Sequence, residues 1–424
     1  TFKLRPGVTF HDGTPWNADA ALFNFERYTN PAHPYFSQAL TASAGLALAG
    51  VKTVTKIDDL TIQIVGPRPD AHLPSDLATI YMASPTALRK EGADGFGAHP
   101  VGTGPFSFVS LQRGQRLELA PNAHYWDGAP KLDKLVLRPI PDAAARVAAL
   151  RAGEVNWIEA PAPDDWQPLH DGGFQTITNS YDHIWPWIFD VTKKPWDDVR
   201  VRQAANYAID RKAMTTSLLH GTAEPAAQLV PRANGSYRTS NDLYRYDPAK
   251  ARQLLADAGY TTPVKATVSI PTGGSGNMAP GPMNEELQQD LAKVGIDVEL
   301  EPIEWAAMIQ SFTVGKIPDG ASALNFSLTF QSESTWSILF DSHSPVNIGH
   351  YANPAVDDAL ARAQATTDDT ARNELYAAAA EQLTKDAAWL FVVNDRNPRA
   401  LAPNVHGFVQ PKSWFCNLTT VWVG

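Results

Sequence analysis

The sequence predicts an α/β protein of more than one domain, with mixed sheets joined by crossover helices. Amphipathic helices and short strands alternate through the second half of the chain, as they do in βαβ units. The 424 residues exceed the usual domain length of about 100 to 200 residues. Hydrophobic residues make up 44% of the chain, which is enough to fill the cores of a globular protein.

The first part of the chain predicts a strand, a helix and a hairpin. Residues 1–10 alternate in strand fashion and end at the turn sequence HDGTP. Asn17 or Asp19 can cap a helix that continues to Tyr28. Residues 51–65 form two alternating segments around an Asp-Asp turn, and they predict a hairpin.

The rest of the chain alternates between the two patterns. Strands are expected at residues 135–140, 155–158, 181–189, 264–270, 295–302 and 388–393. Helices are expected at residues 142–153, 200–219, 248–259, 283–294 and 369–385. The helix that starts at Pro248 has proline in its first turn and glycine at its end, the usual asymmetry of helix termini. This order predicts a mixed sheet with crossover helices.

Composition and charge exclude several classes of protein. The 35 Lys and Arg against 45 Asp and Glu give a net charge of −10, which argues against a nucleic-acid partner. The most apolar stretch, residues 42–51, reaches about half of the roughly 18 to 20 residues that a transmembrane helix needs. Cys416 is the single cysteine, which excludes an intramolecular disulfide, and we expect it to be a small buried side chain.

Signatures of catalysis and metal binding are missing from the sequence. It has no HExxH, GxSxG, P-loop or dinucleotide fingerprint. His343 and His350, the nearest histidine pair, are seven positions apart, which is too far for a helical metal motif. Adjacent aspartates occur at turns and helix starts, where capping explains them. We therefore predict no catalytic residue, no metal and no cofactor.

An aromatic cluster at residues 181–189 is the unusual feature of the sequence. It carries part of the chain's 12 tryptophans, and alternation places Tyr181, His183 and Trp185 on one face. One interpretation is a central strand buried on both faces. The other is the wall of a mostly apolar pocket with a few polar groups. The Gly/Pro-rich loop at residues 271–282 has the same two interpretations, as a linker or as a ligand contact.

Seven local sequences then occur in a recognisable order. They are TFKLRPGVTFHDGTPWNADAALFNFERY (1–28), VGTGPFSF (101–108), NAHYWDGAPKLDKL (122–135), RVRQAANYAIDRKAM (200–214), YDPAKARQLLADAGY (246–260), VGIDVELEPIEWAAM (294–308) and HYANPAVDDALARA (350–363). Over essentially the whole chain this order resembles the family 5 extracellular solute-binding proteins, which are the peptide, nickel, glutathione and oligosaccharide receptors of ABC importers.

The resemblance implies a periplasmic-binding-protein-like fold of class II, cluster C type. It would be a pear-shaped molecule with two lobes and an extra domain. Residues 1–100 match the extra domain, residues 101–180 with 401–424 match part of the first lobe, and residues 181–400 match the second lobe. The hinge strands would lie near Tyr181 and Asn394. Family members carry several dozen residues before the first strand, including an export signal, so we expect an N-terminally truncated chain.

The resemblance also implies a set of ligand-binding residues. These are Tyr35, Tyr181, His183, Trp185, Asn277, Trp305, Phe330, Gln331, Asn394, Asp395 and Arg396. The acid that holds the peptide ammonium in oligopeptide receptors would fall near Phe330, where this chain has none. Asp395 and Asp182 are the remaining candidates for an ammonium. Arg396 and Arg399 could pair with a ligand carboxylate, or both could form surface ion pairs.

The function implied is that of a substrate-binding receptor without chemistry. It would be an exported monomer at the periplasmic or extracellular face of the cytoplasmic membrane. Two lobes would close on a small polar or amphipathic solute, such as a modified peptide, an opine or a sugar derivative. The receptor would then deliver that ligand to the permease subunits of an ABC transporter. The alternative is an unrecognised hydrolase or transferase that acts in the same cleft.

Overall fold

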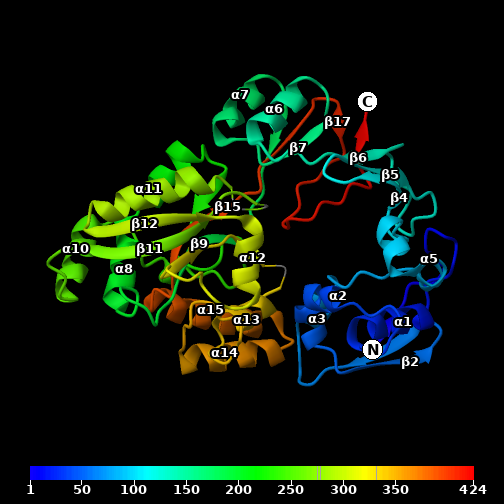
Figure 1. Ribbon diagram of the computed structural model, residues 1–424, viewed down its shortest axis with the longest axis horizontal. Helices are drawn as coiled ribbons and strands as arrows, with labels where there is room; N and C mark the ends of the chain where they lie inside the picture. The colour runs from blue at the N-terminus through cyan, green and yellow to red at the C-terminus, as the bar shows by residue number, and fades with distance from the viewer. Residues whose placement is uncertain (275, 277, 331) are drawn as a thin grey trace. The chain divides into compact units, whose positions relative to one another are not determined.

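The computed structural model describes the chain except residues 275, 277 and 331 (Figure 1). It divides into two compact units. Unit 1 comprises residues 1–145, 404–409 and 416–424, and unit 2 comprises residues 146–403 and 410–415. The three-part division expected from the resemblance, at residues 100, 180 and 400, stays a prediction. Among the described residues, no helix is long and apolar enough to cross a bilayer.

A small antiparallel sheet with helices packed on it opens unit 1. The strands, in the order β1-β3-β2, are β1 (Phe2–Lys3), β2 (Thr53–Asp58) and β3 (Thr61–Val65). The helices are α1 (Ala18–Thr29), α2 (Gln38–Ser43), α3 (Gly45–Ala49) and α4 (Leu73–Leu77). Phe25, Tyr28 and Ile62 are buried between them. The predicted hairpin is confirmed, and so is the helix, which Asn17 caps by accepting from the amide of Ala20 at 3.0 Å.

The predicted first strand is wrong over most of its length. Only Phe2 and Lys3 pair with β3. The chain turns at Pro6 and at Gly7, whose φ of +73° lies in the left-handed region that glycine adopts readily. An isolated bridge between Thr9 and Pro15 replaces the expected extension.

The remainder of unit 1 consists of a helix and two small sheets. The helix is α5 (Pro85–Ala98), which is interrupted at Gly92. One sheet contains β4 (Phe106–Gln112), β5 (Arg116–Pro121) and β6 (Leu135–Leu137). The other contains β17 (Val405–His406) and β18 (Trp422–Val423). The strand expected at residues 135–140 stops at Leu137, and Pro139 follows without a backbone N–H to extend the ladder. Cys416 is partly exposed, so the expectation that it is buried is wrong.

Unit 2 contains two sheets. The smaller one has the order β7-β16-β8 and consists of β7 (Trp157–Glu159), β8 (Gln175–Ile177) and β16 (Arg399–Leu401), all antiparallel. It packs with α6 (Ala143–Arg151) and α7 (Trp166–Asp171), with η1 (Pro163–Asp165) before α7. The helix predicted at residues 142–153 is present as α6, and Asp142 caps it, because its Oδ1 accepts from the amide of Ala145 at 2.7 Å.

The larger sheet of unit 2 has seven strands in the order β10-β15-β9-β13-β11-β12, with β14 paired to β9. They are β9 (His183–Phe189), β10 (Ala223–Pro225), β11 (Val264–Pro271), β12 (Ile296–Ile303), β13 (Ala323–Asn325), β14 (Leu328–Thr329) and β15 (Trp389–Asp395). Strands β11 and β12 are parallel, with α11 (Pro280–Ala292) as the crossover. Strand β9 is antiparallel to β13 and β15. The predicted mixed sheet with crossover helices is confirmed.

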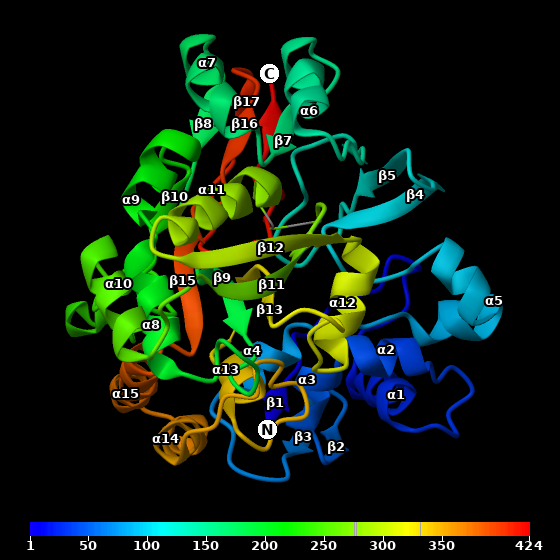
Figure 2. The same ribbon diagram turned by 60° about the vertical axis from the view of Figure 1, so that its left-hand side comes forward.

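Helices cover both faces of this sheet (Figures 1 and 2). One layer contains α8 (Val199–Ala208), α10 (Pro248–Asp257) and α11, and the other contains α13 (Ser334–Phe340), α14 (Pro354–Ala365) and α15 (Asp369–Lys385). Alternate residues of β9 serve the two cores. Ile184 and Ile188 belong to the core under α13–α15, whereas Trp185, Trp187 and Phe189 belong to the core under α8 and α11. The interpretation of residues 181–189 as a strand buried on both faces is therefore confirmed for β9.

The single helix expected at residues 200–219 is wrong. Helix α8 ends at Ala208, and the chain continues as α9 (Arg211–Ala213) and a π-helical turn, η2 (Met214–Leu218). Arg211 is buried, and its Nε donates to the carbonyls of Ala226 and Phe391, both at 2.8 Å. Burial lowers the pKa of Arg211 to about 9. These bonds join Arg211 to carbonyls 15 and 180 residues away in the chain, and no local pattern of the sequence indicates such contacts.

Candidate ligand-binding site

The ends of β9 and β15 meet in a buried polar cluster formed by Tyr181, His183, Asn394 and Asp395, here called the strand-end cluster. The Tyr181 hydroxyl donates to Asp395 Oδ2 at 2.9 Å. The Asp395 amide donates to His183 Nδ1 at 3.0 Å, and Asn394 Nδ2 donates to the His183 carbonyl at 2.5 Å. Each of the four side chains is at most 4% exposed. The structure thus brings four of the predicted site residues together.

The second ring nitrogen of His183 reaches a residue that the sequence did not single out. Because Nδ1 accepts a backbone N–H, the proton of the neutral ring lies on Nε2, which donates to Ser327 Oγ at 2.6 Å. The Ser327 hydroxyl in turn donates to the Gly276 carbonyl at 2.7 Å. Burial lowers the pKa of His183 to about 3. In this arrangement His183 cannot take the proton of Ser327, so the pair does not form an activated nucleophile.

Burial also sets the charge state of the carboxyl group in the cluster. It raises the pKa of Asp395 from its ordinary 3.8 to about 6. The hydrogen bonds from the Tyr181 hydroxyl and from the amides of Asn397 and Arg396, together with the charge of Arg399, lower this pKa but do not outweigh burial. Burial and the neighbouring Asp395 carboxylate raise the pKa of Tyr181 well above its usual range. The cluster at neutral pH therefore contains a carboxylate, a neutral imidazole and a neutral phenol.

Two further predicted residues lie in the cores of unit 2. Trp185 is fully buried in the core under α8 and α11. Phe330 is 7% exposed in the core under α13–α15, with its ring 6.3 Å from the ring of Trp336. The amide of Phe330 donates to the Asp182 carbonyl at 2.8 Å. Both aromatic side chains contribute packing at these positions.

Trp305 and Tyr35 are partly buried residues. Trp305 begins α12 (Trp305–Thr313) and lies nearly parallel to Phe326, with 5.6 Å between centroids. Phe312 stacks on the same Phe326 ring at 4.4 Å. In unit 1, Tyr35 lies 5.9 Å from the Phe23 ring. Half-buried rings of this kind offer flat apolar surfaces for a ligand.

The two arginines past β15 differ in their surroundings. Arg396 is partly exposed, and its Nη1 donates to the Gly221 carbonyl at 3.5 Å. Arg399 is 0% exposed, its Nη2 donates to the Trp414 carbonyl at 2.8 Å, and it lies 3.4 Å from Glu159 Oε1. The alternative that both arginines form surface ion pairs is therefore wrong for Arg399. Asn277 and Gln331 lie outside the described residues.

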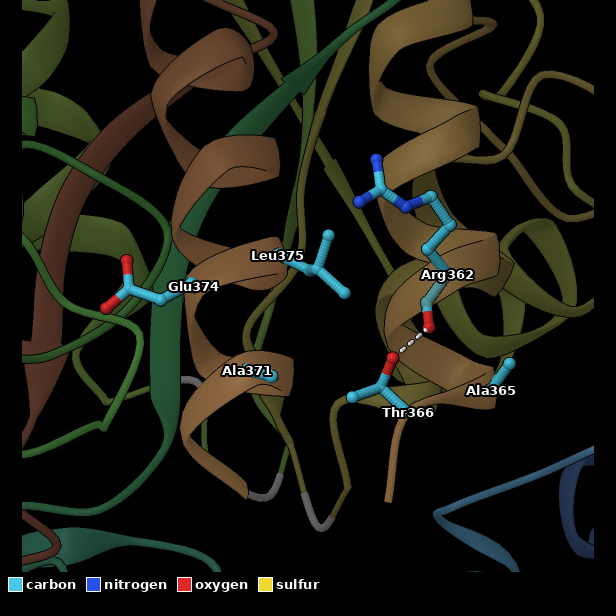
Figure 3. A pocket seen from close by; sticks show the side chains of 6 residues that line it. All are labelled: Arg362, Ala365, Thr366, Ala371, Glu374 and Leu375. Carbon is cyan, nitrogen blue, oxygen red and sulfur yellow. Dashed lines mark hydrogen bonds between the residues drawn. The ribbon is translucent and has the colours of Figure 1, made fainter. Parts of the chain in front are cut away.

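Unit 2 has two other groups of residues that could hold a ligand or an ion. A depression between α14 and α15 is lined by Arg362, Ala365, Thr366, Ala371, Glu374 and Leu375 (Figure 3). It contains none of the predicted site residues. Possible metal-ligand atoms of Asp341, His343 and Asp357 lie within 4.8 Å of one another, but the Ser342 hydroxyl already donates to Asp357 at 2.6 Å. Neither feature points to a particular ligand.

The large sheet of unit 2 lies between two helix layers. The strand-end cluster is buried, and its His183–Ser327 pair does not form an activated nucleophile. These features suit a protein that binds a ligand without altering it. The profile of the bacterial extracellular solute-binding proteins, family 5, matches residues 1–345. The chain belongs to this family, as the sequence comparison predicted. It is the substrate-binding component of an ABC importer and not an enzyme, so the alternative of a hydrolase or transferase is wrong.

Relatives and solved structures agree with this family and with the predicted fold. Heme-binding protein A of Haemophilus influenzae is 32% identical over 429 residues, which cover 97% of this chain and 78% of that protein. Glutathione-binding protein GsiB of Pectobacterium atrosepticum is 32% identical over 428 residues, which cover 98% and 81%. A dipeptide binding protein from Pseudoalteromonas sp. SM9913, solved with Met-Leu, has a TM-score of 0.86 at 22% identity, covering 100% of this chain and 87% of that one. HbpA2 from Haemophilus parasuis has a TM-score of 0.83 at 26% identity, covering 100% and 87%.

Proposed function

We propose that this receptor captures a small solute that carries carboxylate groups, of the modified-peptide class, outside the cytoplasmic membrane. The observation that carries the proposal is the 32% identity, over nearly the whole chain, to proteins named for glutathione and for heme. Both of those ligands carry carboxylates. The ligand would then pass to the permease subunits of an ABC transporter, as the role of the family requires.

The side chains near position 330 support a ligand other than an unblocked peptide. Position 330 carries a phenylalanine, which provides no acid for an ammonium group, and its ring is buried. Asp182 and Glu333 are nearby carboxyls with some exposure, and Asn234 Nδ2 already donates to Asp182 Oδ1 at 2.9 Å. Burial raises the pKa of Asp182, so its charge is weakly compensated by its surroundings. A γ-linked peptide such as glutathione, with two carboxylates and one ammonium, fits this balance better than a plain dipeptide.

Capture would proceed by a hinge motion in the two linkers of unit 2. Residues 178–182 join β8 to β9, and residues 396–398 join β15 to β16. Both linkers connect the small sheet to the large one, and the strand-end cluster lies at their junction. A few backbone dihedrals in these short segments are sufficient for closure. The conclusion that the hinge lies here is part of the proposal.

A binding screen by thermal shift tests the ligand class. The panel contains reduced glutathione, oxidised glutathione, heme, Met-Leu and N-acetylated Met-Leu, with maltose as a control that carries no carboxylate. Glutathione at about 100 times its Kd should stabilise the folded chain by about 2.7 kcal/mol. Stabilisation by Met-Leu alone would contradict the proposal. A heme-specific response, checked by absorption spectroscopy, would replace glutathione by heme as the ligand.

A further inference from the structure

Arg399 of β16 carries a buried guanidinium that is only partly hydrogen-bonded. The residue is 0% exposed. Its Nη2 donates to the Trp414 carbonyl at 2.8 Å and lies 3.4 Å from Glu159 Oε1. Its Nε and Nη1 have no hydrogen-bond partner among the residues that the structure describes. Buried polar groups are nearly always paired in proteins, so two unpaired nitrogens on one guanidinium require an explanation.

Two other buried arginines of unit 2 show how this protein pairs a guanidinium that serves the fold. The three nitrogens of Arg202 donate to backbone carbonyls at 2.6 to 3.1 Å. The three nitrogens of Arg211 also donate to oxygens, at 2.8 to 2.9 Å. Each of these side chains satisfies every nitrogen within the described chain. Arg399 departs from this pattern, although all three residues lie in the same unit.

The backbone beside Arg399 is strained on both of the strands that carry the Arg399–Glu159 pair. These two residues are partners in the register of β16 and β7. Ala160, which follows Glu159, has a φ of +42°, and Asn397, two residues before Arg399, has a φ of +50°. The Ala160 amide donates to the Pro398 carbonyl at 2.9 Å. Left-handed conformations of residues other than glycine cost free energy, and they cluster at sites whose geometry has a use.

Arg399 also lies beside the strand-end cluster. The ring of Trp414, whose carbonyl accepts from Arg399, is 6.5 Å from the Tyr181 ring. The charge of Arg399 is one of the influences that lower the pKa of Asp395. Arg396 is a weaker candidate for a ligand contact, because it is partly exposed and water weakens the ion pairs of exposed side chains.

One of the groups bonded to Arg399 can be replaced by a ligand. The Trp414 carbonyl belongs to residues 410–415, a segment of unit 2 without regular secondary structure. A backbone carbonyl is neutral, and hydrogen bonds in which both groups are charged are about twice as strong as neutral ones. A carboxylate can therefore displace this carbonyl from Nη2. Glu159 stays on the guanidinium as its counter-ion when no ligand is bound.

We propose that Arg399 binds a carboxylate group of the ligand. One carboxylate oxygen takes the place of the Trp414 carbonyl on Nη2, and the other accepts from a nitrogen that now lacks a partner. The planar guanidinium presents two parallel N–H groups, which match the two oxygens of a carboxylate. The inference rests on the proposed function, because it names the residue that would recognise a carboxylate-bearing solute.

Isothermal titration calorimetry of the full chain with reduced glutathione and with its diethyl ester tests this subsite. The ester lacks both carboxylates but keeps the ammonium group and the thiol. The variant is Arg399→Lys, which keeps a positive charge beside Glu159 but cannot present two parallel N–H groups. The ratio of the two Kd values, ester over glutathione, should be at least about tenfold in wild type. It should fall about tenfold in Arg399→Lys, because only the binding of glutathione weakens.

The matched control is Arg202→Lys, at a buried arginine whose nitrogens are all bonded within the fold. It should lower the stability of the chain and leave the ratio of Kd values unchanged. An unchanged ratio in Arg399→Lys, or an equal fall in the control, would overturn the subsite.

A crystal structure of the wild-type chain with glutathione decides the question if Arg399→Lys does not fold. A carboxylate oxygen within hydrogen-bond distance of Arg399 Nε or Nη1 supports the subsite, whereas a water molecule at those nitrogens overturns it. A failure of the proposed function appears differently, as folded wild-type protein that gives no heat of binding with glutathione, and it overturns the subsite as well.

Discussion

Replacing Asp395 by asparagine should change how the stability of the protein depends on pH. The pKa of Asp395 is about 6 in the folded chain against an ordinary 3.8, because burial disfavours the charged form. The folded state therefore binds the proton more tightly than the unfolded state. The stabilising effect is fully present below about pH 4 and is lost as the pH rises through about 6.

The size of the effect follows from that shift. A rise from 3.8 to about 6 corresponds to about 3 kcal/mol at 1.36 kcal/mol per pKa unit. Asparagine does not titrate, so the variant does not lose stability in this way as the pH rises. The free energy of unfolding of Asp395→Asn, minus that of wild type, should therefore rise by about 2 kcal/mol between pH 4 and pH 7, because part of the change already occurs below pH 4. Any constant cost of altered hydrogen bonds cancels in this comparison of differences.

Urea unfolding at pH 4, 5, 6 and 7, followed by tryptophan fluorescence, measures the effect. Asp190→Asn is the matched control, because Asp190 is 2% exposed, and so buried like Asp395, but its pKa is shifted the other way. Burial raises the pKa of Asp190, yet hydrogen bonds from Thr192 and the interaction with His350 outweigh it and lower the pKa. The control difference should therefore stay nearly constant from pH 4 to pH 7, because a carboxyl whose pKa is lowered changes its contribution to stability mainly below pH 4. A pH-independent difference for Asp395→Asn would refute the reasoning.

Three further outcomes are expected. Trp305→Ala should weaken glutathione binding about tenfold, because burying the ring against a ligand is worth roughly 1 to 3 kcal/mol, while the Tm of the free protein stays nearly unchanged. Comparable losses of binding free energy and of folding stability would show that the ring belongs to the core. Trp336→Ala, at a fully buried ring, should lower stability by about 3 to 5 kcal/mol in urea unfolding, and a loss below about 1 kcal/mol would contradict the packing. The His183 ring should show no titration between pH 5 and pH 8 by NMR, because its pKa is about 3, and a midpoint near 6.5 would mean that the ring is open to water.

Local patterns were sufficient for much of the fold. Helix α15 runs from Asp369 to Lys385 as predicted, because the preceding Asp368 caps it and its alanines favour helix. The hairpin of β2 and β3 follows from alternation around two aspartates. The order of seven short motifs was sufficient for the family, since each motif depends on a local turn, cap or strand.

The candidate site depended on contacts that no local pattern contains. Ser327 reaches His183 because β14 pairs with β9 across more than a hundred intervening residues. The pKa of Asp395 follows from its burial at the end of β15, and Arg399 is fully buried with a hydrogen bond to the carbonyl of Trp414, which is distant in the chain. The sequence by itself determined the hairpin, helix α15 and the family to which the chain belongs. Only the tertiary structure decided which polar groups lose water and find partners, because desolvation depends on every segment packed around a group and not on its neighbours in sequence.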